Sequence, residues 1–288
     1  MMLDRRSLLA AGAAGATALA AGACPPRPRP RAIRKALKYG MIQEGSSLAD
    51  RFQVARDVGF DGVELDSPND FDPEEVLRAK ERAGIEIPGV VDSVHWRKTL
   101  GDPDPEVRAA GVAALETALR DCRTYGGTTV LLVPGVVRDA VPYHLVYERS
   151  QAEIRKVLPL AAELDVAIAI ENVWNSFLLS PVEAARYVDE LGGEHVGWYF
   201  DVGNVVRYGF PHHWVRALGE RILKLDVKGY SEAERFDAPI GDDDCGWPKV
   251  MAALDEVGFS GWASAEVRGG KRARLEEILR RMTAVLES

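Results

Sequence analysis

The sequence predicts a (β/α)8 barrel, a closed ring of eight parallel strands surrounded by helices. A short apolar run, a loop and an amphipathic helix recur at intervals of roughly 25–40 residues, which is the rhythm of parallel sheets. Eight such units fall within residues 36–288, and a barrel of this kind needs about 250 residues. The competing open sheet with a dinucleotide site is disfavoured, because residues 41–45 read MIQEG where a glycine-rich phosphate loop would stand.

We expect one domain over residues 36–288, with helices between eight strands. The expected strands are 38–42, 62–65, 86–91, 128–133, 166–171, 196–201, 222–227 and 261–266. Helix starts are indicated by Asp104 before a proline and by Ser180 three residues before Glu183. Gly59 and Gly258 are placed to end helices directly before a strand. Pro159 predicts a kink or a break in the helix over about 147–164.

Residues 1–35 differ from the rest and resemble a bacterial twin-arginine export signal followed by a Pro/Arg-rich linker. Arg5 and Arg6 precede a weakly apolar run that ends at Ala23. We therefore expect recognition by the twin-arginine export machinery and a location in the periplasm or cell envelope. Cys24 after Ala21 leaves lipid attachment open as an alternative.

The composition excludes several classes of protein. With 47% hydrophobic and 28% charged residues, the chain is neither disordered nor a multi-span membrane protein, and no membrane span is expected. Residues 1–35 carry a net charge of +6 and residues 36–288 a net charge of −14, so nucleic acid is not an expected partner. Cys122 and Cys245 have no spacing typical of a disulfide framework or a zinc–sulfur site.

The last four expected strands each end in, or contain, a carboxylate: Glu171, Asp201, Asp226 and Glu266. In a (β/α)8 barrel the carboxyl ends of the strands form the functional face, so these side chains should converge. Four carboxylates in one barrel mouth repel each other, and a divalent cation at their centre would keep them ionised. The alternative is four separate acids that cap helices or pair with Lys and Arg.

Four segments carry a resemblance to a known family: AIEN at 169–172, YFDVGN at 199–204, PIGDDDCGW at 239–247 and GFSGW at 258–262. Together with Glu266, they resemble the xylose isomerase-like TIM-barrel superfamily, nearest its sugar phosphate isomerase/epimerase and ketose 3-epimerase group. The resemblance implies one divalent metal ion held by Glu171, Asp201, Asp226 and Glu266. It also implies that Glu171 and Glu266 move protons next to a sugar carbonyl, through an enediolate.

Two positions depart from the family pattern. Asp226 stands where the family usually has a His ligand, and Asn204 where relatives often have a substrate-binding His. Because all four ligands are then oxygen donors, we expect Mn²⁺ or Mg²⁺ in preference to Zn²⁺.

Further residues are candidates for contacting a substrate. Lys228 lies two residues after Asp226 and therefore on the same side of its strand. We expect it either to pair with Asp226 or a developing enediolate oxygen, or to extend into solvent. His95 and Trp96 follow the third strand, either as a wall for a sugar or as ordinary loop residues, and Asn204 completes this set.

The sequence thus predicts a metal-dependent sugar isomerase or epimerase with a small sugar or keto-sugar as substrate. Two alternatives stay open. One is a lyase or hydrolase acting on keto-sugars or 3-keto-glycosides, similar to inosose dehydratase. The other is a carbohydrate-binding protein without turnover.

Overall fold

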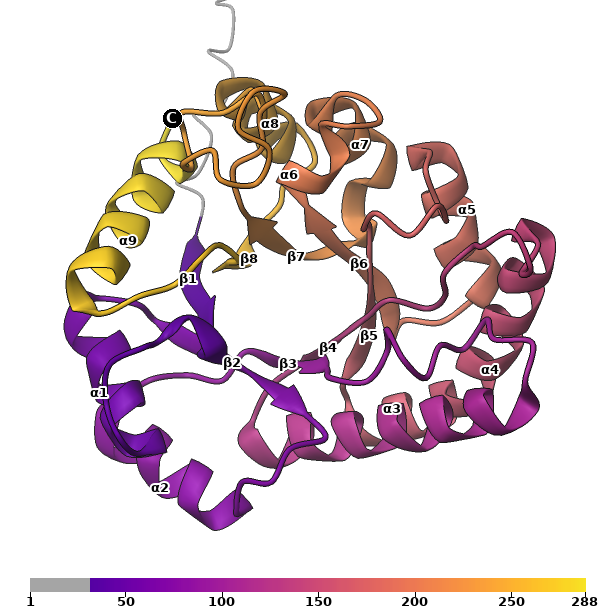
Figure 1. The fold of residues 1–288 in the computed structure, drawn as a ribbon, viewed down its shortest axis with the longest axis horizontal. Helices are drawn as coiled ribbons and strands as arrows, with labels where there is room; N and C mark the ends of the chain where they lie inside the picture. Colours follow the sequence, from indigo (N-terminus) through magenta and orange to yellow (C-terminus); the bar gives the residue numbers. More distant parts are fainter. Residues whose placement is uncertain (1–31) are drawn as a thin grey trace, which may run out of the picture. The chain divides into compact units, whose positions relative to one another are not determined.

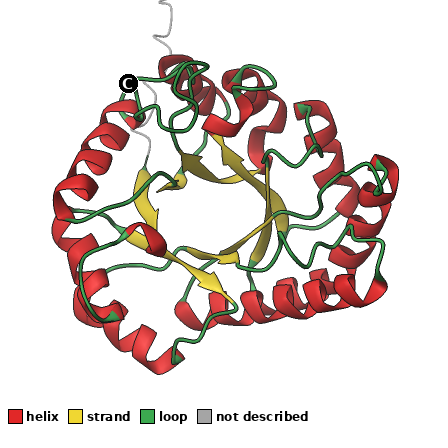
Figure 2. Ribbon diagram, viewed as in Figure 1, coloured by secondary structure: helices red, strands yellow, loops and turns green. Residues whose placement is uncertain are grey.

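A computed structural model describes residues 32–288 as a closed barrel of eight parallel strands (Figure 1). Each strand pairs with the next, and β8 pairs with β1 to close the ring. Helices surround the strands (Figure 2). The predicted (β/α)8 barrel is confirmed. Of the predicted export signal and linker over residues 1–35, residues 1–31, with Arg5, Arg6 and Cys24, lie outside the described residues.

The strands match their predicted positions to within two residues, except that β1 lies elsewhere and β3 begins at Gly89 instead of residue 86, where Glu86 forms only an isolated bridge. They are β1 Ile33–Lys38, β2 Gly62–Ser67, β3 Gly89–Asp92, β4 Thr129–Leu132, β5 Ala167–Glu171, β6 Val196–Asp201, β7 Ile222–Val227 and β8 Gly261–Ala265. The prediction of a first strand at 38–42 is wrong, since Tyr39–Met41 form a single 3-10 turn. The basic residues before Lys38 suggested a linker, but Arg34 lies 4.0 Å above the Trp262 ring on β8, so β1 starts at Ile33.

Nine helices lie within the described residues. They are α1 Leu48–Val58, α2 Pro73–Ala83, α3 Pro105–Tyr125, α4 Tyr143–Leu164, α5 Pro181–Leu191, α6 Val202–Val205, α7 Pro211–Leu218, α8 Trp247–Glu256 and α9 Arg272–Leu286. Asp104 and Ser180 cap α3 and α5 as predicted, each by accepting a backbone N–H.

Pro159 does not divide α4, which runs as one helix. This proline is exposed, so water can hydrate the carbonyl group that loses its N–H partner. No helix in residues 32–288 is long and apolar enough to cross a membrane.

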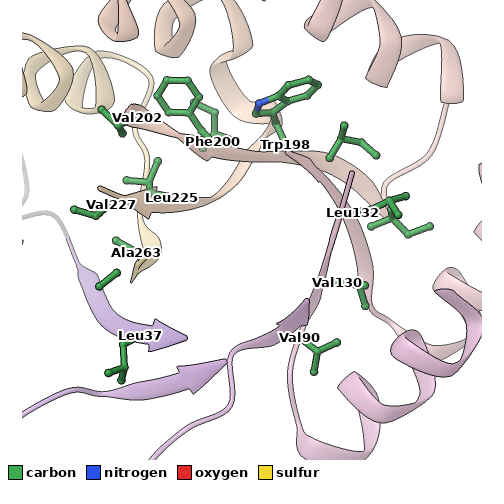
Figure 3. Close-up of a cluster of buried hydrophobic side chains, with 14 of the residues drawn as sticks. Leu37, Val90, Val130, Leu132, Trp198, Phe200, Val202, Leu225, Val227 and Ala263 are labelled. Atoms are coloured by element: carbon green, nitrogen blue, oxygen red, sulfur yellow. The ribbon is translucent and has the colours of Figure 1, made fainter. Parts of the chain in front are cut away.

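The two faces of the ring of strands differ in their side chains. Apolar side chains on their outer face pack against the helices, and Figure 3 shows Leu132, Trp198 and Phe200 among them. Fully burying one such side chain contributes about 1.5–3 kcal/mol. Inside the ring, the apolar cluster of buried residues is confined to Leu131, Ala169 and Tyr199. The remaining buried side chains include charged ones, which form the base of the site described next.

Candidate active site

The structure brings the four predicted carboxylates together at the carboxyl ends of the strands. Glu171 ends β5, Asp201 ends β6, Asp226 lies near the end of β7, and Glu266 follows β8 directly. One ligand oxygen from each lies within 4.8 Å of the other three. Because side chains alternate along a strand, Leu225 and Val227 face outward while Asp226 faces inward.

Asn172 and Asn204 hold Asp201 in place. The Asn172 side chain donates to the Asp201 carbonyl (2.7 Å) and accepts the Asp201 N–H (3.1 Å). Asp201 Oδ1 in turn accepts the backbone N–H of Asn204 (2.7 Å), which caps α6. These bonds leave Asp201 Oδ2 directed at the cluster.

Two lysines reach the cluster from different strands. Lys228 Nζ lies 2.9 Å from Asp201 Oδ2 and also contacts Glu266. Lys38, which ends β1, places Nζ 3.1 Å from Asp226 Oδ1. Of the alternatives expected for Lys228, the pairing with Asp226 is not found, because Lys228 reaches across to β6 and to the residue after β8. The expected partner role falls to Lys38 instead.

The surroundings set the protonation of the carboxyl groups. Burial raises the pKa of Glu171 well above its ordinary value, and repulsion from Glu266 and Asp226 adds to this. Burial likewise raises the pKa of Asp226 well above its usual range, and that of Asp201 to about 6. Burial also disfavours ionisation of Glu266, but the Lys228 and Lys38 ammonium groups outweigh it and lower its pKa. The cluster is thus short of positive charge.

The donor set fits a divalent cation. Asp226 Oδ2 is buried without a hydrogen bond or an ion pair from residues 32–288, and Asp226 Oδ1 and Asp201 Oδ2 are buried with an ammonium group beside each but no hydrogen bond. Leaving buried polar atoms in this state costs free energy unless another partner is present. Carboxylate oxygens are the ligands preferred by Mg²⁺ and Mn²⁺.

A cavity of about 400 Å³ opens beside the cluster. Its lining includes the four residues predicted to contact a substrate, which are His95, Trp96, Asn204 and Lys228. Its polar and aromatic lining includes Asp66, Asp92, His95, Trp96, Glu171, Trp174, Asn204, Lys228, Phe236 and Glu266.

His95 is neutral in this cavity. Burial lowers its pKa to about 3, and its Nδ1 accepts the Val133 N–H (3.2 Å), which assigns the ring proton to Nε2. Trp96 is 46% exposed. The Asn204 amide donates to the Asn172 carbonyl (2.9 Å) and lies 3.5 Å from Glu171 Oε1.

Sequence reasoning missed a charged network below the cluster. Glu64 on β2 accepts hydrogen bonds from Lys224 (2.5 Å), Lys38 (2.7 Å) and the Tyr199 hydroxyl (2.7 Å). A side chain at Gly89 would place its Cβ 2.7 Å from the Lys224 ammonium, so glycine provides the space. The available signal was a charge inside an apolar strand, as in Val-Glu-Leu at 63–65 and Leu-Lys-Leu at 223–225.

The missed aromatic residues of the cavity are Trp174 and Phe236. Their rings pack with centroids 4.6 Å apart, and Phe236 is 40% exposed. Neither residue follows a strand directly, so their positions gave no signal in the sequence.

With this geometry in view, comparison with known proteins identifies the family. A family model described as "Xylose isomerase-like TIM barrel" matches residues 52–287. The chain belongs to the xylose isomerase-like TIM barrel family. This xylose isomerase-like barrel is 22% identical over 245 residues to the L-ribulose-5-phosphate 3-epimerase UlaE of Escherichia coli O157:H7 (strain EC4115 / EHEC). The match covers 80% of the chain and 86% of that relative.

Two solved structures share the fold of this xylose isomerase-like barrel. A crystal structure of D-psicose 3-epimerase in the presence of D-fructose superimposes with a TM-score of 0.74 at 18% identity, covering 89% of this chain and all of that one. A crystal structure of the IOLI protein with a binding zinc atom gives a TM-score of 0.76 at 15% identity, covering 88% and 98% of the two chains.

Proposed function

We propose that this protein is a divalent-metal-dependent sugar epimerase or isomerase that transfers protons next to a substrate carbonyl. The observation that carries the proposal is the convergence of Glu171 and Glu266 with Asp201 and Asp226 beside a cavity of sugar size. The names of the relatives support it, since the ribulose-5-phosphate and psicose enzymes are both 3-epimerases.

Glu171, Asp201, Asp226 and Glu266 would hold the cation. Four carboxylates facing the ammonium groups of Lys38 and Lys228 leave a deficit of two positive charges, which one divalent ion balances. When bound, such an ion supplies Lewis acidity that polarises a substrate carbonyl. The oxygen-only donors favour Mn²⁺ or Mg²⁺ over Zn²⁺.

The protein's own groups would orient the sugar and move its proton. Glu171 and Glu266 come from β5 and from the end of β8, so one can remove a proton and the other can return one. Lys228 contacts Glu266 and lines the cavity, where it can donate to a substrate oxygen. His95 Nε2–H is a second donor. Trp96, Trp174 and Phe236 provide apolar surface for the sugar ring.

Exchange with solvent deuterium tests this function. The Mn²⁺-loaded protein is incubated in D2O with a panel of free ketoses, ketose phosphates and 3-keto-glycosides, and the products are followed by NMR and mass spectrometry. We expect one deuteron at one carbon next to the carbonyl in an epimerised or isomerised product, and no exchange with Glu171→Gln.

The same experiment separates the alternatives. Loss of water or of an aglycone from the substrate would indicate a lyase or hydrolase. Turnover without exchange would indicate hydride transfer and would contradict the roles given to both glutamates. Saturable binding of a sugar without any change in it would indicate a binding protein.

We also propose that the protein is exported, on the basis of Arg5, Arg6 and the weakly apolar run that follows. Replacing both arginines with lysine should retain the precursor inside the cell, whereas Arg27→Lys in the linker should not. Cell fractionation with antibody detection measures this, and unchanged export of the double variant would contradict the proposal.

A further inference from the structure

Asp226 is the member of the cluster whose carboxyl group receives no side-chain or backbone hydrogen bond from residues 32–288. Its side chain is completely buried. Its one recorded ion pair is with Lys38, at 3.1 Å from Oδ1. Asp201, in contrast, has the Asn204 N–H on Oδ1 and Lys228 near Oδ2. A buried carboxylate without a cation is strongly destabilising, so the charge on Lys38 has a specific recipient.

The second carboxylate beside Lys38, that of Glu64, does not need the Lys38 charge as its counter-ion. Lys38 Nζ also donates to Glu64 (2.7 Å), but Glu64 already has a counter-ion in Lys224 at 2.5 Å, with both of those side chains 1% exposed. The Lys224–Glu64 pair is therefore neutral by itself. The carboxylate that remains uncompensated without Lys38 is Asp226.

The position of the Lys38 ammonium is fixed from three sides. The ammonium group donates hydrogen bonds to Glu64 Oε2 (2.7 Å) and to the Tyr199 hydroxyl (3.2 Å), and it forms an ion pair with Asp226 Oδ1, which lies 3.1 Å from Nζ. The backbone adds a further constraint, because Lys38 and Glu64 are register partners in the pairing of β1 with β2. The ammonium is thus held in one place, facing one oxygen of Asp226.

We propose that Lys38 is the counter-ion and positioning residue of Asp226: it binds Oδ1 and so leaves Oδ2 for a divalent cation. This inference rests on the proposed metal site. Glu64, Tyr199 and Lys224 form the support that holds Lys38. In this arrangement Asp226 and Lys38 act as one neutral unit, which adds a ligand oxygen to the site without adding net charge.

A thermodynamic cycle on the metal-free protein tests the pairing. Melting temperatures are measured for wild type, Lys38→Met, Asp226→Asn and the double variant, with Lys35→Met on the same strand as the matched control. Lys38→Met should lower the melting temperature because it removes the one ammonium group that contacts the buried Asp226 carboxyl group among residues 32–288. Adding Asp226→Asn should recover part of that loss. Because this change also relieves repulsion from the other carboxylates in both backgrounds, it should stabilise Lys38→Met more than it stabilises wild type.

Equal effects of Asp226→Asn in the two backgrounds would overturn the inference. If Lys38 served Glu64 alone, Asp226→Asn would change the melting temperature of Lys38→Met by no more than it changes that of wild type. Should Lys38→Met fail to fold, Lys38→Arg keeps the charge and carries the test through the metal spectrum described next.

The electron paramagnetic resonance spectrum of bound Mn²⁺ tests the positioning role separately. Lys38→Met and Lys38→Arg should change the zero-field splitting of the bound ion, while Lys35→Met should not. A wild type that binds Mn²⁺, with Lys38 variants of unchanged spectrum and affinity, would overturn this inference and leave the proposed function intact. A wild type that binds no Mn²⁺ would overturn the metal site and the positioning role together.

Discussion

The two halves of the barrel contribute differently to the site. β5 to β8 present all four carboxylates, each at or near the carboxyl end of its strand. β1 instead supplies Lys38, which pairs with Asp226, and β2 supplies Glu64, which accepts a hydrogen bond from Lys38. The two halves meet where β8 pairs with β1. The four carboxylates thus come from four consecutive strands, whereas the lysine that pairs with Asp226 comes from the first strand of the barrel.

The largest difference between the halves should appear in turnover. Changing Glu171 or Glu266 to Gln keeps an oxygen donor of similar size but removes the base, so each variant should lose about 10²–10⁴-fold in kcat while remaining folded. Steady-state kinetics at saturating Mn²⁺ measures the loss, so that weakened metal binding is not mistaken for lost chemistry. A variant with near wild-type kcat would remove that residue from proton transfer.

The supporting half should show its effect in stability. Glu64→Gln leaves the Lys38 and Lys224 ammonium groups close together and buried with one carboxylate fewer, which should cost about 3–5 kcal/mol in the free energy of unfolding. The matched control is Glu86→Gln, whose half-exposed pair with Arg34 should contribute less than about 1 kcal/mol. Urea unfolding of the metal-free proteins compares them. Equal losses in the two variants would refute a special role for the buried network.

A smaller effect concerns pH. In the metal-free protein the pKa of Asp201 is raised to about 6 and those of Glu171 and Asp226 are raised further by burial, so the folded site holds protons that a cation must displace. Affinity for Mn²⁺ should therefore fall as the pH falls, by about tenfold per pH unit for each proton displaced. His95, with a pKa of about 3, should contribute nothing to this slope between pH 5 and 8.

Calorimetric titrations between pH 5 and 8 measure the slope, and His95→Gln is the control from the other half of the barrel. A flat profile in wild type would show that the carboxylates are already ionised before the metal binds. A slope that disappears in His95→Gln would assign the proton to the histidine instead.

The sequence revealed the ligand half of the site because its signal is local. A carboxylate directly after an apolar run, as at Glu171 and Asp201, is visible within five or six residues, and strand periodicity then decides which way it points. The fold followed from the recurrence of strand and helix patterns, and the family from the resemblance carried by the segments at 169–172, 199–204, 239–247 and 258–262. The same periodicity placed Lys228 inside the mouth but not its partners, since these lie on neighbouring strands.

Lys38 and Glu64 were missed as site residues because their partners on β7 lie far away in the chain and approach them only when the barrel closes. Arg34 and Lys35 of β1 fall within the predicted linker, although Arg34 packs on Trp262 of β8. Lys38 falls within the predicted first strand, but nothing near it in the sequence indicates that it reaches Asp226 of β7. Trp262 and Asp226 lie more than 180 residues beyond Arg34 and Lys38 in the chain. Only the pairing of β1 with β8 brings these charges together.

Binding of Mn²⁺ to the metal-free protein tests the central claim most directly. Calorimetry combined with elemental analysis should give one ion per chain, and Asp201→Asn should weaken binding by at least about tenfold, because a neutral amide replaces a ligand carboxylate. Asp189→Asn, which removes an acid paired with Arg221 outside the cluster, should leave the affinity unchanged. Absence of binding in wild type, or equal affinity in wild type and Asp201→Asn, would contradict a metal site at the four carboxylates.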